Sequence, residues 1–312
     1  MDKPRFLDLH CDTITRGKGL RGNGCQVDLL RVPEGWQWCQ AFAVWVPDEY
    51  RGRAALDYFR RFAGEFHGEM ARHGDRIRQV RSTRELEEAL EAGFHAAFLT
   101  VEGGAALMGE MESLDLLWEE GVRMLTLTWN GPNELGSGCA AQGGLTPFGK
   151  AALARMEELG IAADVSHLND EGFADVVRLA RRPFAASHSD SRAVRGHRRN
   201  LTDQQFMAIR DAGGIVGINF YVDFLDGLGP GRTDLPPESL MRHIFHFLEL
   251  GGEDCIALGS DFDGAQVPDF IGDISGVATL REIMLQSGLG PVLTDKILFR
   301  NGLDFWKRYE KS

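Results

Sequence analysis

Short apolar runs alternate with stretches of helical periodicity along almost the whole chain, and this alternation limits the fold more than any other feature. Strands that alternate with helices form parallel βαβ units. Eight such units in 312 residues fit a (β/α)8 barrel, which typically needs about 250 residues plus insertions. We therefore predict an α/β protein with a TIM barrel, and an open doubly wound sheet is the alternative. The strand candidates are 6–10, 39–46, 95–102, 122–129, 161–167, 183–188, 214–220 and 255–261.

The segments between these runs carry helix signals. Ser82 with Glu85 and Thr202 with Gln205 are capping-box patterns. Residues 238–250 place apolar side chains on one helical face. No Pro- or Ser-rich linker, low-complexity stretch or internal repeat divides the sequence, so a single domain over residues 1–312 is predicted.

The charge balance and the cysteines argue against several classes of protein. A net charge of −12 disfavours nucleic acid or an anionic membrane as the main partner, because both bind basic surfaces. Five scattered cysteines without a C-x-x-C pair favour a reducing compartment over a disulfide framework. The sequence shows no apolar core of signal-peptide length and no run of the roughly 18 apolar residues that a membrane helix needs. We expect a cytoplasmic protein without a membrane anchor.

Residues of the types that commonly bind metal ions, namely histidine, aspartate and glutamate, lie at the ends of five of the runs. The first run ends in His10 and Asp12, which lie two residues apart and therefore face the same side of an extended strand. Alone, this pair could be a buried histidine bonded to an aspartate. The later runs add Glu102, His167, His188 and Asp261 at the same ends. Active sites of such barrels lie at the carboxyl ends of the strands. The six residues therefore predict a binuclear hydrolytic site with a bridging carboxylate.

The mixture of nitrogen and oxygen ligands favours zinc or a similar divalent ion. Magnesium and calcium prefer ligand shells made of oxygen alone. Each residue also has a simpler interpretation. Glu102 precedes two glycines and could be a turn residue. His167 and His188 follow buried runs and could be core histidines with satisfied hydrogen bonds.

Other polar residues are candidates on weaker grounds. Asn219 and Tyr221 lie two apart at the end of the seventh run, where they form a substrate wall or simply pack the strand. Arg199 lies in a basic loop, which is either surface charge or a guanidinium fork for a substrate carboxylate. His243 and His246 lie three apart in a predicted helix, and we expect partly buried amphipathic positions there rather than ligands.

Six segments of the chain, taken in order and spacing, resemble the signatures of one enzyme family. They are Phe6-Leu-Asp-Leu-His-Cys-Asp12, Thr100-Val-Glu-Gly-Gly104, Asp164-Val-Ser-His167, Ala186-Ser-His188, Arg198-Arg-Asn200 and Gly259-Ser-Asp-Phe-Asp-Gly264. The family is the membrane dipeptidase (renal dipeptidase) family, peptidase family M19 of the amidohydrolase superfamily. The resemblance runs nearly end to end and implies a (β/α)8 barrel with two zinc ions that hydrolyses dipeptides.

The resemblance also implies the metal ligands by position. His10 and Asp12 would hold the first zinc ion, and Glu102 would bridge the two ions. His167 and His188 would hold the second.

The remaining roles follow in the same way. Arg199 would bind the carboxylate of the dipeptide, and Asp261 would act as general base and then as proton donor to the leaving amine. Strand alternation cannot choose between Asp261 and Asp263, and the family pattern selects Asp261.

The chain departs from the family pattern after Leu-Thr-Leu-Thr at 125–128. Animal members carry a histidine there that contacts the region of the scissile carbonyl, whereas this chain has Trp129. An indole donates one hydrogen bond but cannot accept a proton. Either Asn130 or Asn133 supplies the missing polar contact, or the metal alone polarises the carbonyl.

The resulting functional prediction is a zinc-dependent dipeptidase that cleaves L-Xaa-L/D-Xaa substrates with a metal-bridging hydroxide. The alternative is a binuclear amidohydrolase of another small amide, such as an N-acyl amino acid or a lactam. A non-catalytic metal-binding barrel is a third hypothesis. The expected partner is a small dipeptide, and a homodimer is a possible assembly.

Overall fold

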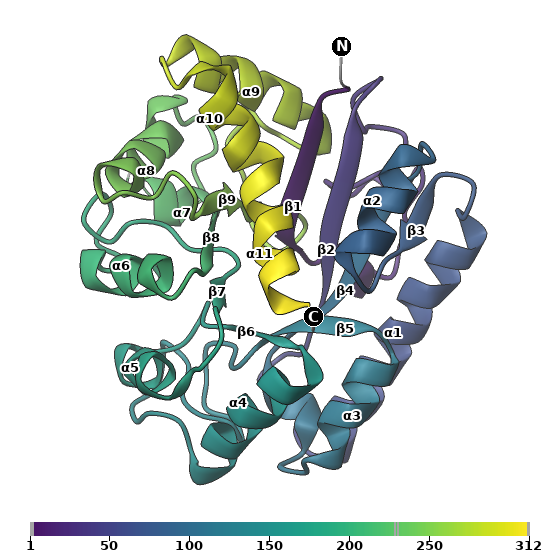
Figure 1. The fold of residues 1–312 in the computed structure, drawn as a ribbon, viewed down its shortest axis with the longest axis vertical. Coiled ribbons are helices and arrows are strands. Elements are labelled where there is room, and N and C mark those ends of the chain that lie inside the picture. The colour runs from purple at the N-terminus through teal and green to yellow at the C-terminus, as the bar shows by residue number, and fades with distance from the viewer. Residues whose placement is uncertain (1–2, 228, 230, 311–312) are drawn as a thin grey trace.

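Eight parallel strands close into a barrel in the computed structural model, which describes residues 3–227, 229 and 231–310 (Figure 1). Each strand pairs with the next along the chain, and β1 pairs with β9 to complete the ring. The prediction of a (β/α)8 barrel is confirmed. The barrel strands are β1 Arg5–Cys11, β2 Gln37–Trp45, β4 His95–Glu102, β5 Val122–Thr126, β6 Ala162–Asp164, β7 Ala185–Ala186, β8 Ile215–Ile218 and β9 Ile256–Leu258.

One further strand lies outside the predicted set. The short β3 (Ile77–Gln79) pairs in parallel with the first residues of β4, from His95 to Ala97. β5 pairs with β4 from Leu99 onward. β3 therefore extends the sheet beside β4 without entering the ring.

Several barrel strands are shorter than the apolar runs predicted, and the last polar residues of those runs lie beyond the strand ends. Beyond the strand ends, aspartate side chains accept hydrogen bonds from backbone amides that would pair with a neighbouring strand if the sheet continued. Asp164 Oδ1 accepts from the Ser187 amide, with N and O 2.9 Å apart. Asp8 Oδ1 accepts from the Ser260 amide at 2.8 Å. These bonds satisfy the two amides, just beyond the ends of β7 and β9, without strand pairing.

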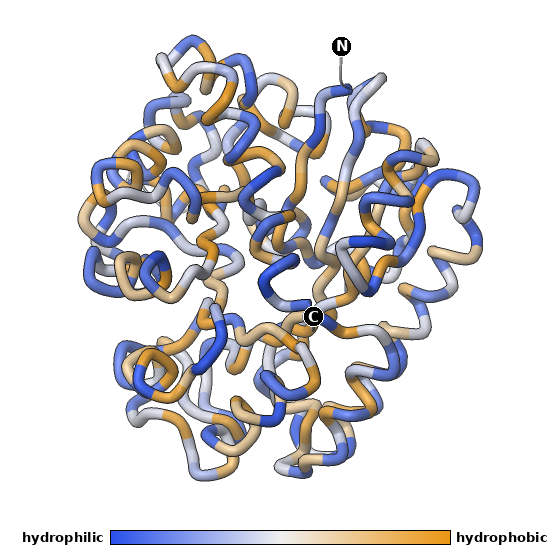
Figure 2. The backbone as a smooth tube through the Cα atoms, in the orientation of Figure 1, coloured by the Kyte–Doolittle hydropathy of each residue, from blue (hydrophilic) through white to orange (hydrophobic). Residues whose placement is uncertain are grey.

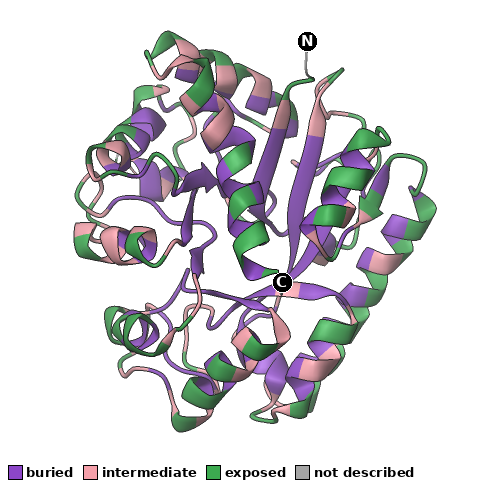
Figure 3. Ribbon diagram, viewed as in Figure 1, coloured by how far each residue is buried: buried purple, intermediate pink, exposed green. Residues whose placement is uncertain are grey.

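The helices surround the barrel, and Figure 3 shows buried strands inside and exposed outer helix faces. Along the peripheral helices, hydrophobic and hydrophilic stretches alternate in Figure 2. Both capping signals are confirmed, since Ser82 Oγ accepts from the Glu85 amide and Thr202 with Gln205 forms a full capping box. The α-helices are α1 Arg53–Arg72, α2 Thr83–Glu91, α3 Glu112–Glu119, α4 Pro147–Leu159, α5 Asp170–Leu179, α6 Asp203–Asp211, α7 Val222–Leu225, α8 Glu238–Glu249, α9 Val277–Gln286, α10 Gly290–Asp295 and α11 Asn301–Tyr309.

Helix α11 crosses one end of the barrel, where it contacts β1, β8 and β9 (Figure 1). Its Trp306 stacks on Phe98 of β4, with the ring centroids 4.4 Å apart. Among the described residues, no helix combines the length and the apolar character that a membrane crossing requires.

His243 on α8 is a core histidine, whereas a partly buried position was expected. Its side chain is fully buried, its Nδ1 accepts from the Ser191 amide at 3.0 Å, and its Nε2 donates to the Leu225 carbonyl at 3.1 Å. His246 is half-buried, and its Nε2 pairs with Asp203 Oδ1 at 2.8 Å. Both histidines therefore support the fold through hydrogen bonds.

Burial lowers the pKa of His243 to about 4, so the fold should lose stability in acid through this group. The ring is neutral in the folded chain and titrates near 6.5 when unfolded. Its contribution is therefore complete above pH 6.5 and is lost as the pH falls towards 4. Between pH 7 and 5 this loss amounts to about 2 kcal/mol. Urea unfolding of the wild type and of His243→Asn at both pH values should show this difference, because Asn keeps an acceptor but does not titrate. Equal pH dependence of the two proteins would contradict the assignment.

Candidate functional site

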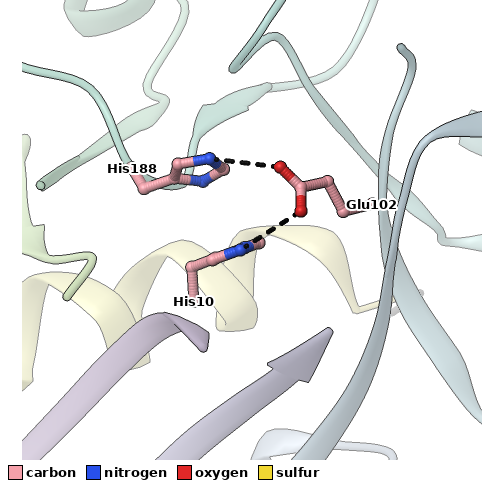
Figure 4. A group of neighbouring side chains, drawn as sticks. All are labelled: His10, Glu102 and His188. Carbon is pink, nitrogen blue, oxygen red and sulfur yellow. Dashed lines mark ion pairs between the residues drawn. The ribbon is translucent and has the colours of Figure 1, made fainter. Parts of the chain in front are cut away.

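The predicted ligands from β1 and β4 converge at the carboxyl end of the barrel. His10 Nε2 lies 3.7 Å from Asp12 Oδ2 and 3.6 Å from Glu102 Oε2. Figure 4 shows the Glu102 carboxylate beside the stacked rings of His10 and His188, with one oxygen toward each ring. All four side chains are buried. Residues from three separate strands or strand ends therefore share one small volume.

The second oxygen of Glu102 faces the other two histidines. Glu102 Oε1 lies 2.7 Å from His167 Nε2 and 3.4 Å from His188 Nε2. The two Nε2 atoms lie 3.0 Å apart. Because each oxygen of the carboxylate faces a different set of groups, Glu102 has the geometry of a bridge between two positions.

Two of the predicted site residues have a left-handed backbone conformation, which sets the direction of their side chains. His167 has φ +72° and Asp261 has φ +60°, a region that non-glycine residues seldom occupy. Such conformations persist where the surrounding structure imposes them and are frequent at functional sites. Gly264 completes the turn, because a Cβ atom there would lie 2.0 Å from Asp12 Oδ2 and 2.4 Å from Asp261 Oδ1. The chain can approach the cluster only with glycine at this position.

Asp261 and Asp263 have different surroundings, which strand alternation could not distinguish. Asp261 Oδ2 accepts from Asn219 Nδ2 at 3.0 Å, and an Asp261 oxygen lies within 4.8 Å of ligand atoms of His10 and Asp12. Asp263 instead ties loops together: its oxygens accept from Thr13 Oγ1 at 2.6 Å and from the amides of residues 26 and 27. Of these two aspartates, Asp261 has its carboxylate close to the cluster, whereas the carboxylate of Asp263 is occupied by hydrogen bonds that hold loops together.

The charges of the cluster call for a cation. Burial alone would lower the pKa of His10, but the carboxylates of Glu102 and Asp12 outweigh it and raise that pKa to about 10. Burial, reinforced by the same two carboxylates, raises the pKa of Asp261 to about 7. The three acidic groups around His10 thus favour a positive charge at its position. A metal ion bound there would supply that charge without protonation of the ring.

Two unpartnered atoms fit the same conclusion. His10 Nε2 and Asp12 Oδ1 are buried, and neither has a hydrogen-bond partner among the described residues. Buried polar atoms are nearly always paired, and an unpaired one calls for an explanation such as an ion. The residues therefore fit a metal centre.

A cavity of about 550 Å³ opens over the cluster. Its walls include Trp45, Trp129, Tyr221 and Phe224, together with Asp12, Glu102, His167 and Asp261. Trp45 and Trp129 pack edge to face, with ring centroids 5.1 Å apart. Trp45 and Phe224 were not singled out from the sequence, although Trp45 is the last residue but one of the predicted run 39–46 and so lies at the same end of its strand as the ligands do.

Arg199 is buried beside this cavity, unlike a surface charge. Its guanidinium donates to the His188 carbonyl at 3.3 Å and to Ser189 Oγ at 3.5 Å, and it lies over the Phe224 ring. Arg199 Nε is buried without a hydrogen-bond partner among the described residues. A buried cation with a free donor is a ready anion site.

The other predicted substrate residues have different places. Trp129, Asn130 and Tyr221 line the cavity. Asn219 is fully buried and contacts Asp261, which places it behind the cavity wall. Asn133 is engaged in its own turn, since its Oδ1 accepts from the amides of residues 135 and 136.

Comparisons with known proteins agree with this geometry. The family model of the membrane dipeptidases, peptidase family M19, matches residues 3–312. An uncharacterised protein encoded in the pqqA 5′ region of Klebsiella pneumoniae is 37% identical over 242 residues, which cover 75% of this chain and 89% of the relative.

Solved structures are similar over nearly the full length. The dipeptidase AC, a metallopeptidase of family M19, superposes with a TM-score of 0.94 at 30% identity and covers 99% of both chains. A metallopeptidase from Rhodobacter sphaeroides, crystallised with a phosphinate mimic of the dipeptide L-Ala-D-Ala, superposes with a TM-score of 0.93 at 29% identity. It covers 99% of this chain and all of its own. The chain therefore belongs to the membrane dipeptidase family, peptidase family M19, and is a hydrolytic metallo-dipeptidase.

Proposed function

We propose that the enzyme uses two zinc ions to hydrolyse dipeptides of the form L-Xaa-L/D-Xaa. His10, Asp12 and Glu102 would hold one ion, and Glu102, His167 and His188 would hold the other. The observation that carries this proposal is the position of Glu102, whose two oxygens face separate groups of ligands. When bound, two such ions would acidify the attacking water and polarise the scissile carbonyl.

Asp261 is the residue best placed to move the proton. Its side chain is held by Asn219 and lies beside the predicted ligands. Divalent ions nearby favour its ionised form. Asp261 can thus take a proton from the attacking water and pass it to the leaving amine.

The buried Arg199 at the cavity supports a dipeptide as substrate. The buried guanidinium would pair with the free carboxylate, and a fixed end of this kind rejects longer peptides. The Rhodobacter relative was crystallised with a mimic of L-Ala-D-Ala, which supports activity on a D-residue at the second position.

Replacing Arg199 with methionine should raise KM for dipeptides at least about 30-fold, equivalent to about 2 kcal/mol. Methionine keeps most of the apolar contact with Phe224 but loses the cation, so kcat should change little. Steady-state kinetics on L,L- and L,D-dipeptides would measure the effect, with N-acyl amino acids beside them as the competing substrate class.

Arg198→Met is the matched control, because Arg198 is an exposed arginine at the same cavity. A rim charge of this kind should alter KM by less than about threefold. If Arg199→Met left KM at the wild-type value, or if acylated amino acids were the better substrates, the dipeptide proposal would fail.

We also propose a reducing compartment such as the cytoplasm. All five cysteines are free, and four of them are buried. A chain without disulfides has no need of an oxidising environment.

A further inference from the structure

The two histidines of the second metal position are each held at Nδ1 by a residue outside the ligand set. His188 Nδ1 lies 2.7 Å from Ser187 Oγ, and His167 Nδ1 lies 2.9 Å from Asn130 Oδ1. The Nε2 atoms of the two rings face one another at 3.0 Å. The ring protons decide whether that contact is a hydrogen bond or a place for a cation.

The proton on His188 follows from the surroundings of Asp164. Asp164 Oδ1 accepts from the amides of Ser166 and Ser187, at 3.0 and 2.9 Å. Asp164 Oδ2 accepts from Thr126 Oγ1 at 2.5 Å and from Ser187 Oγ at 2.6 Å. Because a hydroxyl has one hydrogen and Ser187 gives it to Asp164, Ser187 Oγ can only accept from His188. His188 therefore carries its proton on Nδ1.

The amide of Asn130 plays the same part for His167. Asn130 Oδ1 lies 2.9 Å from His167 Nδ1 and accepts from Cys139 Sγ at 3.1 Å. An amide oxygen accepts hydrogen bonds and cannot donate them. His167 therefore also carries its proton on Nδ1.

With both protons on Nδ1, neither Nε2 has a hydrogen to share. The two lone pairs then face each other at 3.0 Å and also face Glu102 Oε1, at 2.7 Å from His167 Nε2 and 3.4 Å from His188 Nε2, so three electron-rich atoms surround one place that a cation would fill. We propose that Ser187, backed by Asp164, and Asn130, backed by Cys139, are positioning residues that fix both tautomers and present both Nε2 lone pairs to one metal ion. The inference rests on the proposed two-zinc function and deepens it. It also gives Asn130 a role other than substrate contact.

The position of Ser187 is itself fixed by close packing. A Cβ atom on Gly217 or on Gly259 would lie 1.9 Å from the Ser187 carbonyl oxygen. Both glycines therefore let neighbouring strands close on Ser187, whose side chain is fully buried. The hydroxyl has little freedom to leave His188.

The test is the affinity for zinc, measured by chelator competition on the full-length protein. Ser187→Ala should lower the affinity for one of the two zinc ions about 10- to 100-fold, as loss of a hydrogen-bond partner of a metal-bound histidine generally does. The other ion should keep its affinity within about threefold. Thr126→Val is the matched control, because it removes the other hydroxyl from Asp164 Oδ2 but leaves the Ser187–His188 contact in place. It should change neither affinity by more than about threefold.

A second pair of variants tests Asn130. Asn130→Asp keeps an oxygen acceptor for His167 Nδ1 and should bind the second ion with an affinity close to that of the wild type. Asn130→Leu should lower that affinity about 10- to 100-fold. The contrast would not arise if Asn130 only filled space.

The tautomers can also be read directly from the ring nitrogens by ¹⁵N NMR of the metal-free wild type. Protonated Nδ1 and unprotonated Nε2 on both rings are expected, and Nε2–H on either ring would overturn the inference even if a variant failed to fold. Tight binding of both ions by Ser187→Ala would overturn it as well. A wild-type protein that takes up no zinc would instead overturn the proposed function.

Discussion

Replacing Asp261 with asparagine is expected to lower kcat for dipeptides by roughly 10²- to 10⁴-fold, the range of a lost general acid–base group. The two side chains have the same shape, and Asn219 can still bond to the new amide, so the fold should survive. Asparagine cannot accept a proton at neutral pH, and the attacking water would lose its base. Steady-state kinetics together with the metal content of the protein would measure the effect.

Asp263→Asn is the matched control for this change. Asp263 lies two residues away at the same cavity, but its oxygens bond to Thr13 and to the amides of residues 26 and 27. This variant should lose about 1–3 kcal/mol of stability, because backbone donors keep a weaker acceptor. Its kcat should stay within about tenfold of the wild type. A larger loss of kcat in Asp263→Asn than in Asp261→Asn would reverse the assignment.

The fold was predictable because strands buried on both faces are continuous apolar runs, and parallel barrels repeat such runs eight times. The ends of the strands were not predictable in the same way. β7 has two residues although its apolar run continues to His188, since the Ser187 amide bonds to Asp164 rather than to a neighbouring strand. Asp164 is far away in sequence, and no local pattern shows that its carboxylate accepts there.

The candidate site was also predictable only in part: the sequence indicates which residues meet, but not how each side chain is directed or buried. The types of residue at the run ends were sufficient to place His10, Glu102 and His188 together, because parallel strands end at one rim. Their directions were not predictable where the backbone turns left-handed, as at Asp261. The burial of Arg199 depends on Phe224 and on the His188 carbonyl, which only the folded chain brings to it.

Replacing Glu102 with glutamine should remove both ions of the proposed binuclear centre and reduce dipeptide hydrolysis to background. One oxygen of Glu102 faces His10 and the other faces His167 and His188, so one substitution alters both proposed ion positions. Removal of even one unit charge about 4 Å from an ion costs roughly 4 kcal/mol at an effective dielectric constant of about 20. This corresponds to about a thousandfold in affinity. Elemental analysis after dialysis against a weak chelator would measure the metal content.

Glu69→Gln provides the matched control for that experiment. Glu69 is also a buried glutamate, but it lies on α1, where its carboxylate accepts from the Leu20 amide at 2.7 Å. Glu69→Gln should lose some stability, yet it should retain both ions and the activity of the wild type, because Glu69 does not line the cavity. If Glu102→Gln kept two tightly bound ions per chain, Glu102 would not be the bridge, and the proposed binuclear centre would need a different carboxylate between its ions.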